Sequence, residues 1–96
     1  MALRGRMTRE MDWLTSMGLT TEEIGSLNPC VPGEFTLPDT CYVNAATPRI
    51  VYHAGGEGTL PFLSGRWYIV PNDVVQQHPE LRRDTVPVAR SVRLTR

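Results

Sequence analysis

From residue 30 onward the sequence is a succession of short apolar runs separated by prolines and glycines, and this pattern limits the possible folds most. β-Branched and aromatic residues dominate the runs and favour strands, whereas proline interrupts helices. Residues 59–63, between two of the runs, are predicted to form a loop that covers an edge of the sheet. The predicted strands are 35–37, 40–45, 49–54, 66–71 and 86–94.

The first 28 residues have a helical pattern instead. Thr8 can cap a first helix, and Gly18 suits the left-handed residue that ends it. Thr20 and Glu23 have the spacing of a capping box for a second, short helix, which ends at 28–29 because proline disfavours a helical residue before it. The apolar positions of the first helix follow a three-and-four spacing: Met7, Met11, Leu14 and Met17.

The chain has 96 residues, which is the size of one small domain. The predicted fold class is therefore α+β, with an N-terminal helical hairpin over 1–28 followed by a small antiparallel sheet or partial barrel of four to five strands. The β-rich body spans 30–96 and includes a short helix near 73–78, which Asn72 or Asp73 can cap. All of 1–96 is predicted as a single domain.

Charge is unevenly distributed along the chain, although the formal net charge is zero. Residues 1–9 carry +3 and residues 82–96 carry +4, whereas 10–81 carries −7. Basic ends on an acidic body can pair head to tail with copies of the same chain or reach an acidic neighbour, and solvated termini are the alternative. The sequence has no apolar run of about 18 residues and no secretory signal pattern, which predicts a location in the host cytoplasm or in a virion.

Residues that could support catalysis or metal binding do not form a known pattern. Cys30, Cys41, His53 and His78 lack the close ligand pairs of zinc sites. The two cysteines can form a disulfide if their strands are adjacent, but two buried free thiols are expected in a reducing cytosol. A glycine-rich stretch at 55–58 follows a strand without opening a helix, so the usual phosphate site is missing. We therefore predict no enzyme activity, no cofactor and no metal site.

The stretch "GLTTEEIGSL", residues 18–27, resembles the first helix of helix-turn-helix DNA-binding regulators over about ten residues. The resemblance implies DNA binding only if a second helix follows and enters the major groove. Pro29, Pro32 and Pro38 interrupt that region, so the sequence predicts no sequence-specific DNA binding.

Two segments are candidates for binding a partner protein. Methionine and tryptophan in the first helix can pack on the sheet or meet a partner, because flexible thioethers and a broad ring fit irregular surfaces. In residues 86–94 an extended strand would place Arg90 on the face of Val88 and Val92, and such a strand can add to the sheet edge of another chain. The candidate partner-binding residues are Met7, Met11, Trp13, Met17, Arg90, Arg93 and Arg96.

These features predict a non-enzymatic interaction or structural subunit of a larger protein assembly. The specific hypothesis is a small bacteriophage accessory, adaptor or decoration protein whose partners are proteins, with copies of itself among the candidates. The alternatives are a DNA-binding transcriptional regulator with a degenerate helix-turn-helix and a small inhibitor that docks onto a host enzyme. No small-molecule substrate and no membrane partner is predicted.

Overall fold

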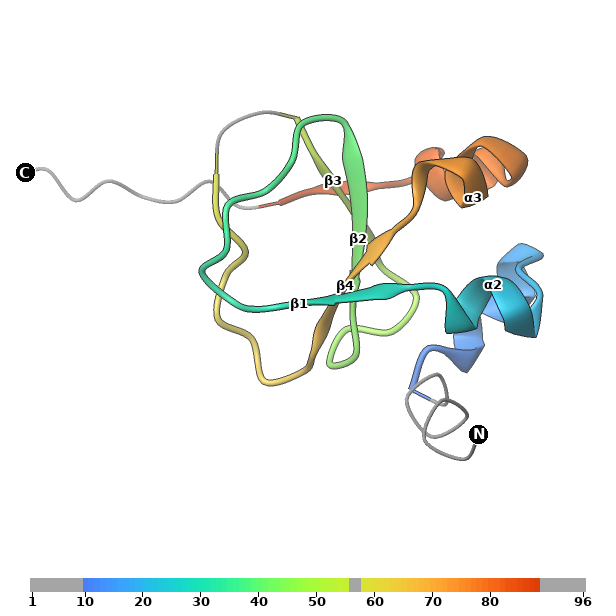
Figure 1. The fold of residues 1–96 in the computed structure, drawn as a ribbon, viewed down its shortest axis with the longest axis horizontal. Helices are drawn as coiled ribbons and strands as arrows, with labels where there is room; N and C mark the ends of the chain where they lie inside the picture. The colour runs from blue at the N-terminus through green and yellow to red at the C-terminus, as the bar shows by residue number, and fades with distance from the viewer. Residues whose placement is uncertain (1–9, 56–57, 89–96) are drawn as a thin grey trace, which may run out of the picture.

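The computed structural model describes residues 10–55 and 58–88 and has a mixed α+β architecture. Short helices lie at one side of a five-stranded sheet, and two long loops lie at the other (Figure 1). The elements are η1 (Asp12–Met17), α2 (Thr21–Gly25), β1 (Asn28–Cys30), β2 (Thr40–Asn44), β3 (Val51–Ala54), β4 (Trp67–Val70), α3 (Asn72–Gln77), η2 (Pro79–Arg82) and β5 (Val86–Pro87).

The sheet is mixed rather than purely antiparallel. Its strand order is β1-β4-β2-β3-β5, and β5 pairs with β3 in parallel while the other neighbours are antiparallel. In the centre Cys41 of β2 lies opposite His53 of β3 and Val70 of β4. The α+β class is confirmed, and the antiparallel prediction needs this correction at β5.

The predicted strands at 40–45, 49–54 and 66–71 contain β2, β3 and β4. Residues 35–37 form no strand, because Phe35 makes only an isolated bridge with Thr59. The predicted strand at 86–94 begins with β5, and its part beyond Val88 lies outside the described residues.

One edge strand, β1, was not predicted from the sequence. Asn28 and Pro29 were expected to end a helix, but they pair with Ile69 and Tyr68 of β4. Proline lacks an N–H and is tolerated at a sheet edge, because no second strand needs that donor. Residues 28–30 can therefore form the outermost strand although Pro29 has no N–H to donate.

The predicted N-terminal helical hairpin is not confirmed. The described part of this region holds a six-residue 3-10 helix, η1, and a five-residue α-helix, α2. Gly18, with φ 95°, ends η1 as expected, and Thr8 lies outside the described residues. The capping box is confirmed, since Thr20 Oγ1 accepts from the Glu23 N–H at 3.1 Å and Glu23 Oε1 accepts from the Thr20 N–H at 2.9 Å.

The predicted helix near 73–78 is present as α3, but its start differs from the prediction. Pro71 occupies the capping position and no side-chain hydrogen bond caps the helix, so the predicted cap by Asn72 or Asp73 is wrong. His78, after the end of α3, lies with Nε2 2.8 Å from Glu23 Oε1 and thus links this region to α2. No helix in the described part of the chain has the length and apolar character that a membrane crossing requires.

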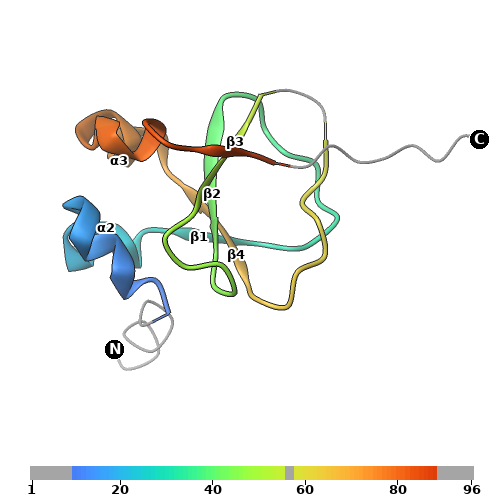
Figure 2. The ribbon, with the colours of Figure 1, turned by 180° about the vertical axis from the view of Figure 1, so that it is seen from behind.

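Both faces of the sheet are buried, by different means. Figure 2 shows the short helices at one side of the strands and the long loops at the other. On the face that we call helix-covered, the strands pack against apolar side chains of η1, α2, α3 and η2. On the face that we call loop-covered, they pack against residues of the loops. The buried residues of the helix-covered face are Met11, Leu14, Leu19, Ile24, Leu27, Cys41, Val43, Val51, Tyr68, Val70, Val74, Val75 and Leu81. Those of the loop-covered face are Tyr42, Ala54, Leu60 and Trp67.

Candidate functional site

Two loops lie against each other at the side of the sheet away from the helices (Figure 1). The first follows β1 and the second precedes β4. The Gly33 N–H donates to the Leu60 carbonyl at 2.7 Å, and the Leu60 N–H donates to the Glu34 carbonyl at 3.0 Å. The Thr36 N–H donates to the Gly58 carbonyl at 3.0 Å. The loops therefore support each other through their backbones, although neither forms a regular strand here.

Buried aromatic side chains of the sheet fasten each loop. The Tyr42 hydroxyl accepts a hydrogen bond from the Leu37 N–H at 2.9 Å, and the Trp67 Nε1–H donates to the Pro61 carbonyl at 2.9 Å. Burial raises the pKa of Tyr42, so its hydroxyl stays neutral over the ordinary pH range. Each loop thus has a fixed point on the loop-covered face of the sheet.

Gly33 allows a close approach between the two loops. Its φ is 85°, and a Cβ at this position would lie 3.1 Å from Cζ of Phe62. A residue with a side chain would be strained by the backbone angle and crowded by the ring. The Phe62 ring therefore lies close to the first loop at a position that glycine leaves open.

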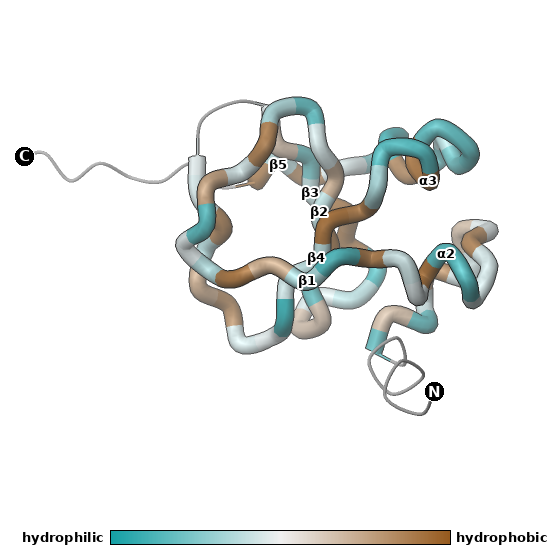
Figure 3. Tube along the Cα trace, viewed as in Figure 1, coloured by the Kyte–Doolittle hydropathy of each residue, from teal (hydrophilic) through white to brown (hydrophobic). Residues whose placement is uncertain are grey.

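Most of the exposed large apolar side chains in the described part of the chain lie on these two loops. Phe35 is 79% exposed and Phe62 is 81% exposed. Hydrophobic stretches follow both loops in Figure 3. Five of the six exposed large hydrophobic residues belong to the loops and define what we call the two-loop surface: Val31, Phe35, Leu37, Phe62 and Leu63. The sixth is Val86.

Exposed aromatic side chains on a fastened backbone are typical of a protein-binding surface. Scattered apolar residues are normal on proteins, but a group of them held on neighbouring segments favours association. The ring of a phenylalanine loses little conformational freedom on binding, and a backbone that is already ordered adds little further entropy cost. Glu34 is the one charged residue in 31–37 and 58–63, so the surface is apolar with an acidic contribution.

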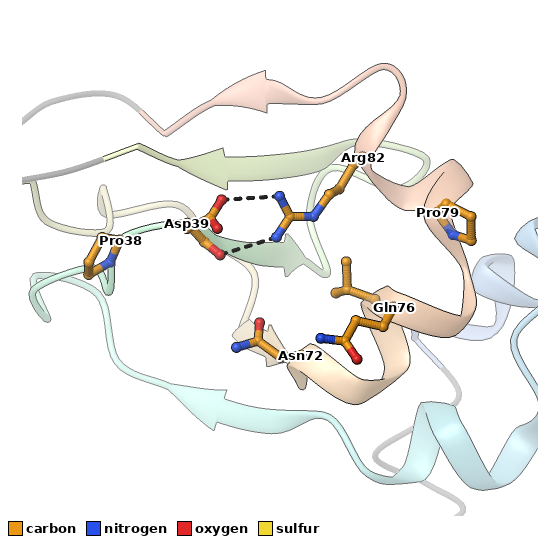
Figure 4. Close-up of a pocket in the computed structure, with 7 residues that line it drawn as sticks. Pro38, Asp39, Asn72, Gln76, Pro79 and Arg82 are labelled. Carbon is orange, nitrogen blue, oxygen red and sulfur yellow. Dashed lines mark hydrogen bonds and ion pairs between the residues drawn. The ribbon is translucent and has the colours of Figure 1, made fainter.

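A second candidate lies between the start of β2 and the α3–η2 region, where a depression has a volume of about 470 Å³ (Figure 4). Arg82 Nη1 donates to Asp39 Oδ1 at 3.0 Å, and His53 Nε2 lies 3.1 Å from the same oxygen. The His53 hydrogen bond, followed by Arg82, lowers the pKa of Asp39. Asn72 and Gln76 of α3 also line the depression.

This depression holds a paired carboxylate rather than a reactive group. Asp39 is already bonded by two side chains, and its own φ of 56° is in the left-handed region that aspartate tolerates. Cys41 is the nearest nucleophile by register, opposite His53, but burial raises the pKa of its thiol. A thiol that stays protonated is a poor nucleophile. The geometry therefore favours a structural ion pair here.

Both cysteines are free thiols in the structure, Cys41 buried and Cys30 half-buried. Burial, with a smaller effect of the Glu34 carboxylate, raises the pKa of Cys30 to about 11. Within residues 10–55 and 58–88, no group of three or more histidine, cysteine or acidic side chains could hold a metal ion. The candidate function of the described residues therefore rests on the shape and polarity of the two-loop surface, and not on these thiols or a metal site.

Three of the predicted partner-binding residues lie in the described part of the chain, and four lie outside it. Met11 is fully buried in the core of the helix-covered face, so its side chain supports the fold and is not available to a partner in this structure. Trp13 and Met17 are half-buried and pack against the same core. The remaining four lie outside the described residues: Met7, Arg90, Arg93 and Arg96.

The two-loop surface was not identified from the sequence. Residues 35–37 were assigned to a strand and 59–63 to a loop covering a sheet edge, which gave Phe35 and Phe62 no separate role. A usable signal was present, since Phe35 lies between Pro32 and Pro38 and Phe62 directly follows Pro61, and proline disfavours a central strand.

Comparisons of this chain with protein-family models, with curated proteins and with solved structures find no match.

Proposed function

We propose that this protein is a non-enzymatic interaction subunit of a larger protein assembly and that it binds a partner protein through the two-loop surface. The supporting observation is that Phe35 and Phe62 are exposed while the loops that carry them are hydrogen-bonded to each other and to the sheet. Apolar anchors of this kind contribute most of the binding energy at protein interfaces.

The arrangement of the loops favours binding over mere solvent exposure. Tyr42 and Trp67 are buried and use their polar tips to hold Leu37 and Pro61, so the loops are ordered before any partner arrives. Ordering a surface in advance reduces the entropy cost of association.

The chemistry of the described residues supports a non-enzymatic role. The one cysteine opposite a histidine, Cys41, is buried with a raised pKa, and the histidine is paired with Asp39 instead. The region after α2 holds β1 and a loop, so a helix-turn-helix would lack its recognition helix there. These observations favour a protein partner over a substrate or a specific DNA site.

The specific form that we propose is an accessory, adaptor or decoration subunit of a bacteriophage particle, located in the host cytoplasm or the virion. A small chain with one prepared apolar surface suits a part that is added to an existing assembly. An inhibitor that docks onto a host enzyme uses the same kind of surface, and the identity of the captured partner separates these two functions.

The proposal is tested with the double variant Phe35→Ser, Phe62→Ser. We expect co-purification of the partner from the native extract to be lost, because truncating central aromatic anchors costs about 2 kcal/mol or more each. The control is the double variant Glu22→Ser, Gln77→Ser, which changes two exposed residues of the helices and keeps the complex. A Phe35, Phe62 variant that retains full partner occupancy while the helical control loses it would contradict the proposal.

A further inference from the structure

The described chain reaches the loop-covered face at its last residues. β5 pairs in parallel with β3, and the Val88 N–H donates to the His53 carbonyl at 3.1 Å. Val88 packs against the buried cluster that contains Tyr42, Leu60 and Trp67. The following residues, 89–96, are therefore covalently joined to the chain beside the layer that carries the two-loop surface.

Residues 89–96, "ARSVRLTR", are chemically complementary to the two-loop surface. They contain three arginines, no acidic residue, and the apolar side chains Val92 and Leu94. The two-loop surface offers exposed phenylalanines and the exposed carboxylate of Glu34, whose Oε1 accepts a hydrogen bond from the Val31 N–H at 3.0 Å. Aliphatic side chains can cover the rings while guanidinium groups pair with the acid or stack on an aromatic face.

Binding to the surface of a second copy is favoured over folding back onto the same chain. Residues 89–96 contain no glycine, proline, asparagine or aspartate, and Ser91 is their one residue of the types that dominate tight turns. β5 runs away from the helices toward the side of the loops (Figure 1). An extended continuation of eight residues spans about 26 Å, which is long enough to reach a neighbouring molecule.

We propose that residues 89–96 of one copy bind the two-loop surface of another copy, so that the chain associates head to tail. This inference rests on the proposed function, because it assigns an occupant to the same surface. The interface is heterologous: each copy contributes a different surface to each of its two neighbours. Such contacts generate a ring if the rotation closes and a filament if it does not.

A mixing experiment tests this geometry with two full-length double variants. The surface variant is Phe35→Ser, Phe62→Ser, and the segment variant is Val92→Ser, Leu94→Ser. We expect light scattering after size exclusion to give a concentration-dependent mass above the monomer for the wild type and a monomer for each variant alone. Mixing the variants should restore dimers but nothing larger, because the mixture has one intact surface and one intact segment per pair.

Each outcome of this experiment decides the inference. A monomeric wild type, or a mixture that stays monomeric, overturns it, since the first indicates no association and the second a symmetric interface. A segment variant that associates like the wild type also overturns it, and the proposed function then still stands if the surface variant loses its partner. Urea-unfolding midpoints equal to the wild-type value for both variants ensure that loss of association is not loss of fold.

The charged side chains give a second readout. Replacing Arg90, Arg93 and Arg96 with Gln should weaken association less than the segment variant does, because Val92 and Leu94 remain. Added salt should reduce wild-type association and leave the Gln variant unchanged. An association that is abolished by the Gln variant yet unaffected by Val92→Ser, Leu94→Ser would overturn the assignment of the apolar contacts.

Discussion

The two faces of this sheet are covered in opposite ways. On the helix-covered face, short helices turn their apolar side chains inward, and Leu14 and Met11 have no exposed surface. On the loop-covered face, Leu60 turns inward, while Phe35 and Phe62 on the same loops point to solvent. The helices are held by apolar contacts with the sheet, whereas the loops are also held by hydrogen bonds to the tips of Tyr42 and Trp67.

This difference suggests that the helix-covered face mainly stabilises the fold, whereas the loops on the other face present apolar side chains for binding. Apolar side chains that are buried in a core cannot contact a partner. A small chain that has to fold and also bind a partner therefore needs another way to order its binding surface. Polar tips on buried aromatic rings provide it, because each ring contributes buried area and one directed hydrogen bond. Substitutions on the two faces are therefore expected to have different effects on stability and on binding.

The largest effect is expected at the base of the second loop, for Gly65→Ala. A Cβ at Gly65 would lie 2.2 Å from the backbone nitrogen of Ala46 and 2.6 Å from Oδ1 of buried Asn44. Because backbone must move, we expect a loss of more than about 4 kcal/mol in unfolding free energy, measured by urea denaturation. The control is Gly55→Ala, where no atom of the described residues lies within 4 Å of the added Cβ. Equal stability of the two variants would show that the loop base can shift freely.

A matched pair of leucines compares the two coverings directly. Leu14→Ala should cost about 2 to 5 kcal/mol, because it removes a fully buried side chain from the core. Leu37→Ala, on the two-loop surface, should change the unfolding free energy by about 0.5 kcal/mol or less, since the side chain is 56% exposed. Calorimetric or urea unfolding measures both. Similar losses for the two variants would break the proposed division between the faces.

Removing one fixed point of the loops should have a local effect. In Tyr42→Phe the ring stays but the Leu37 N–H loses its acceptor, which should cost about 1 kcal/mol. We expect hydrogen exchange of the Leu37 amide to accelerate about fivefold. Tyr52→Phe, which removes the hydroxyl bonded to Thr47, is the control and should leave this amide unchanged. An unchanged exchange rate in Tyr42→Phe would mean that the loop–loop contacts order this backbone without the bond to Tyr42.

The stability of the helix-covered face should depend on pH in the alkaline range, where Tyr68 loses its proton. Burial, with the hydrogen bond to Glu10, raises the pKa of Tyr68 from 10.0 to about 12. The folded state thus favours the neutral phenol, and the stability it contributes is present below pH 10 and lost as pH rises toward 12. Ultraviolet titration of wild type and Glu10→Gln checks this. The variant should lower the pKa only partly, because burial is the larger cause.

Local signals in the sequence were sufficient for part of this structure. Gly18 and the pair Thr20 and Glu23 act within one helical turn, so their roles follow from spacing alone. The central strands could be predicted because they contain runs of β-branched and aromatic residues. In contrast, β1 and β5 have three and two residues, and their pairing depends on partners far along the chain.

The candidate surface could not be predicted, for a related reason. Phe35 and Met11 are both apolar, and the sequence does not state which one faces the core. Phe35 is exposed, and the backbone two residues further on is held by the hydrogen bond from the Leu37 N–H to Tyr42, which is a contact between the loop and the sheet. Met11 is buried because the short helix packs on the sheet. Tertiary contacts therefore decide the direction of both side chains.

Site-specific photo-crosslinking tests the central claim most directly. A photoreactive phenylalanine analogue replaces Phe62 on the two-loop surface in one version of the protein and exposed Gln77 of α3 in another, and both are irradiated in the native extract. The account predicts a discrete protein adduct from position 62 and none from position 77. An adduct from position 77 with none from position 62 would contradict it, because the partner would then bind the helical side.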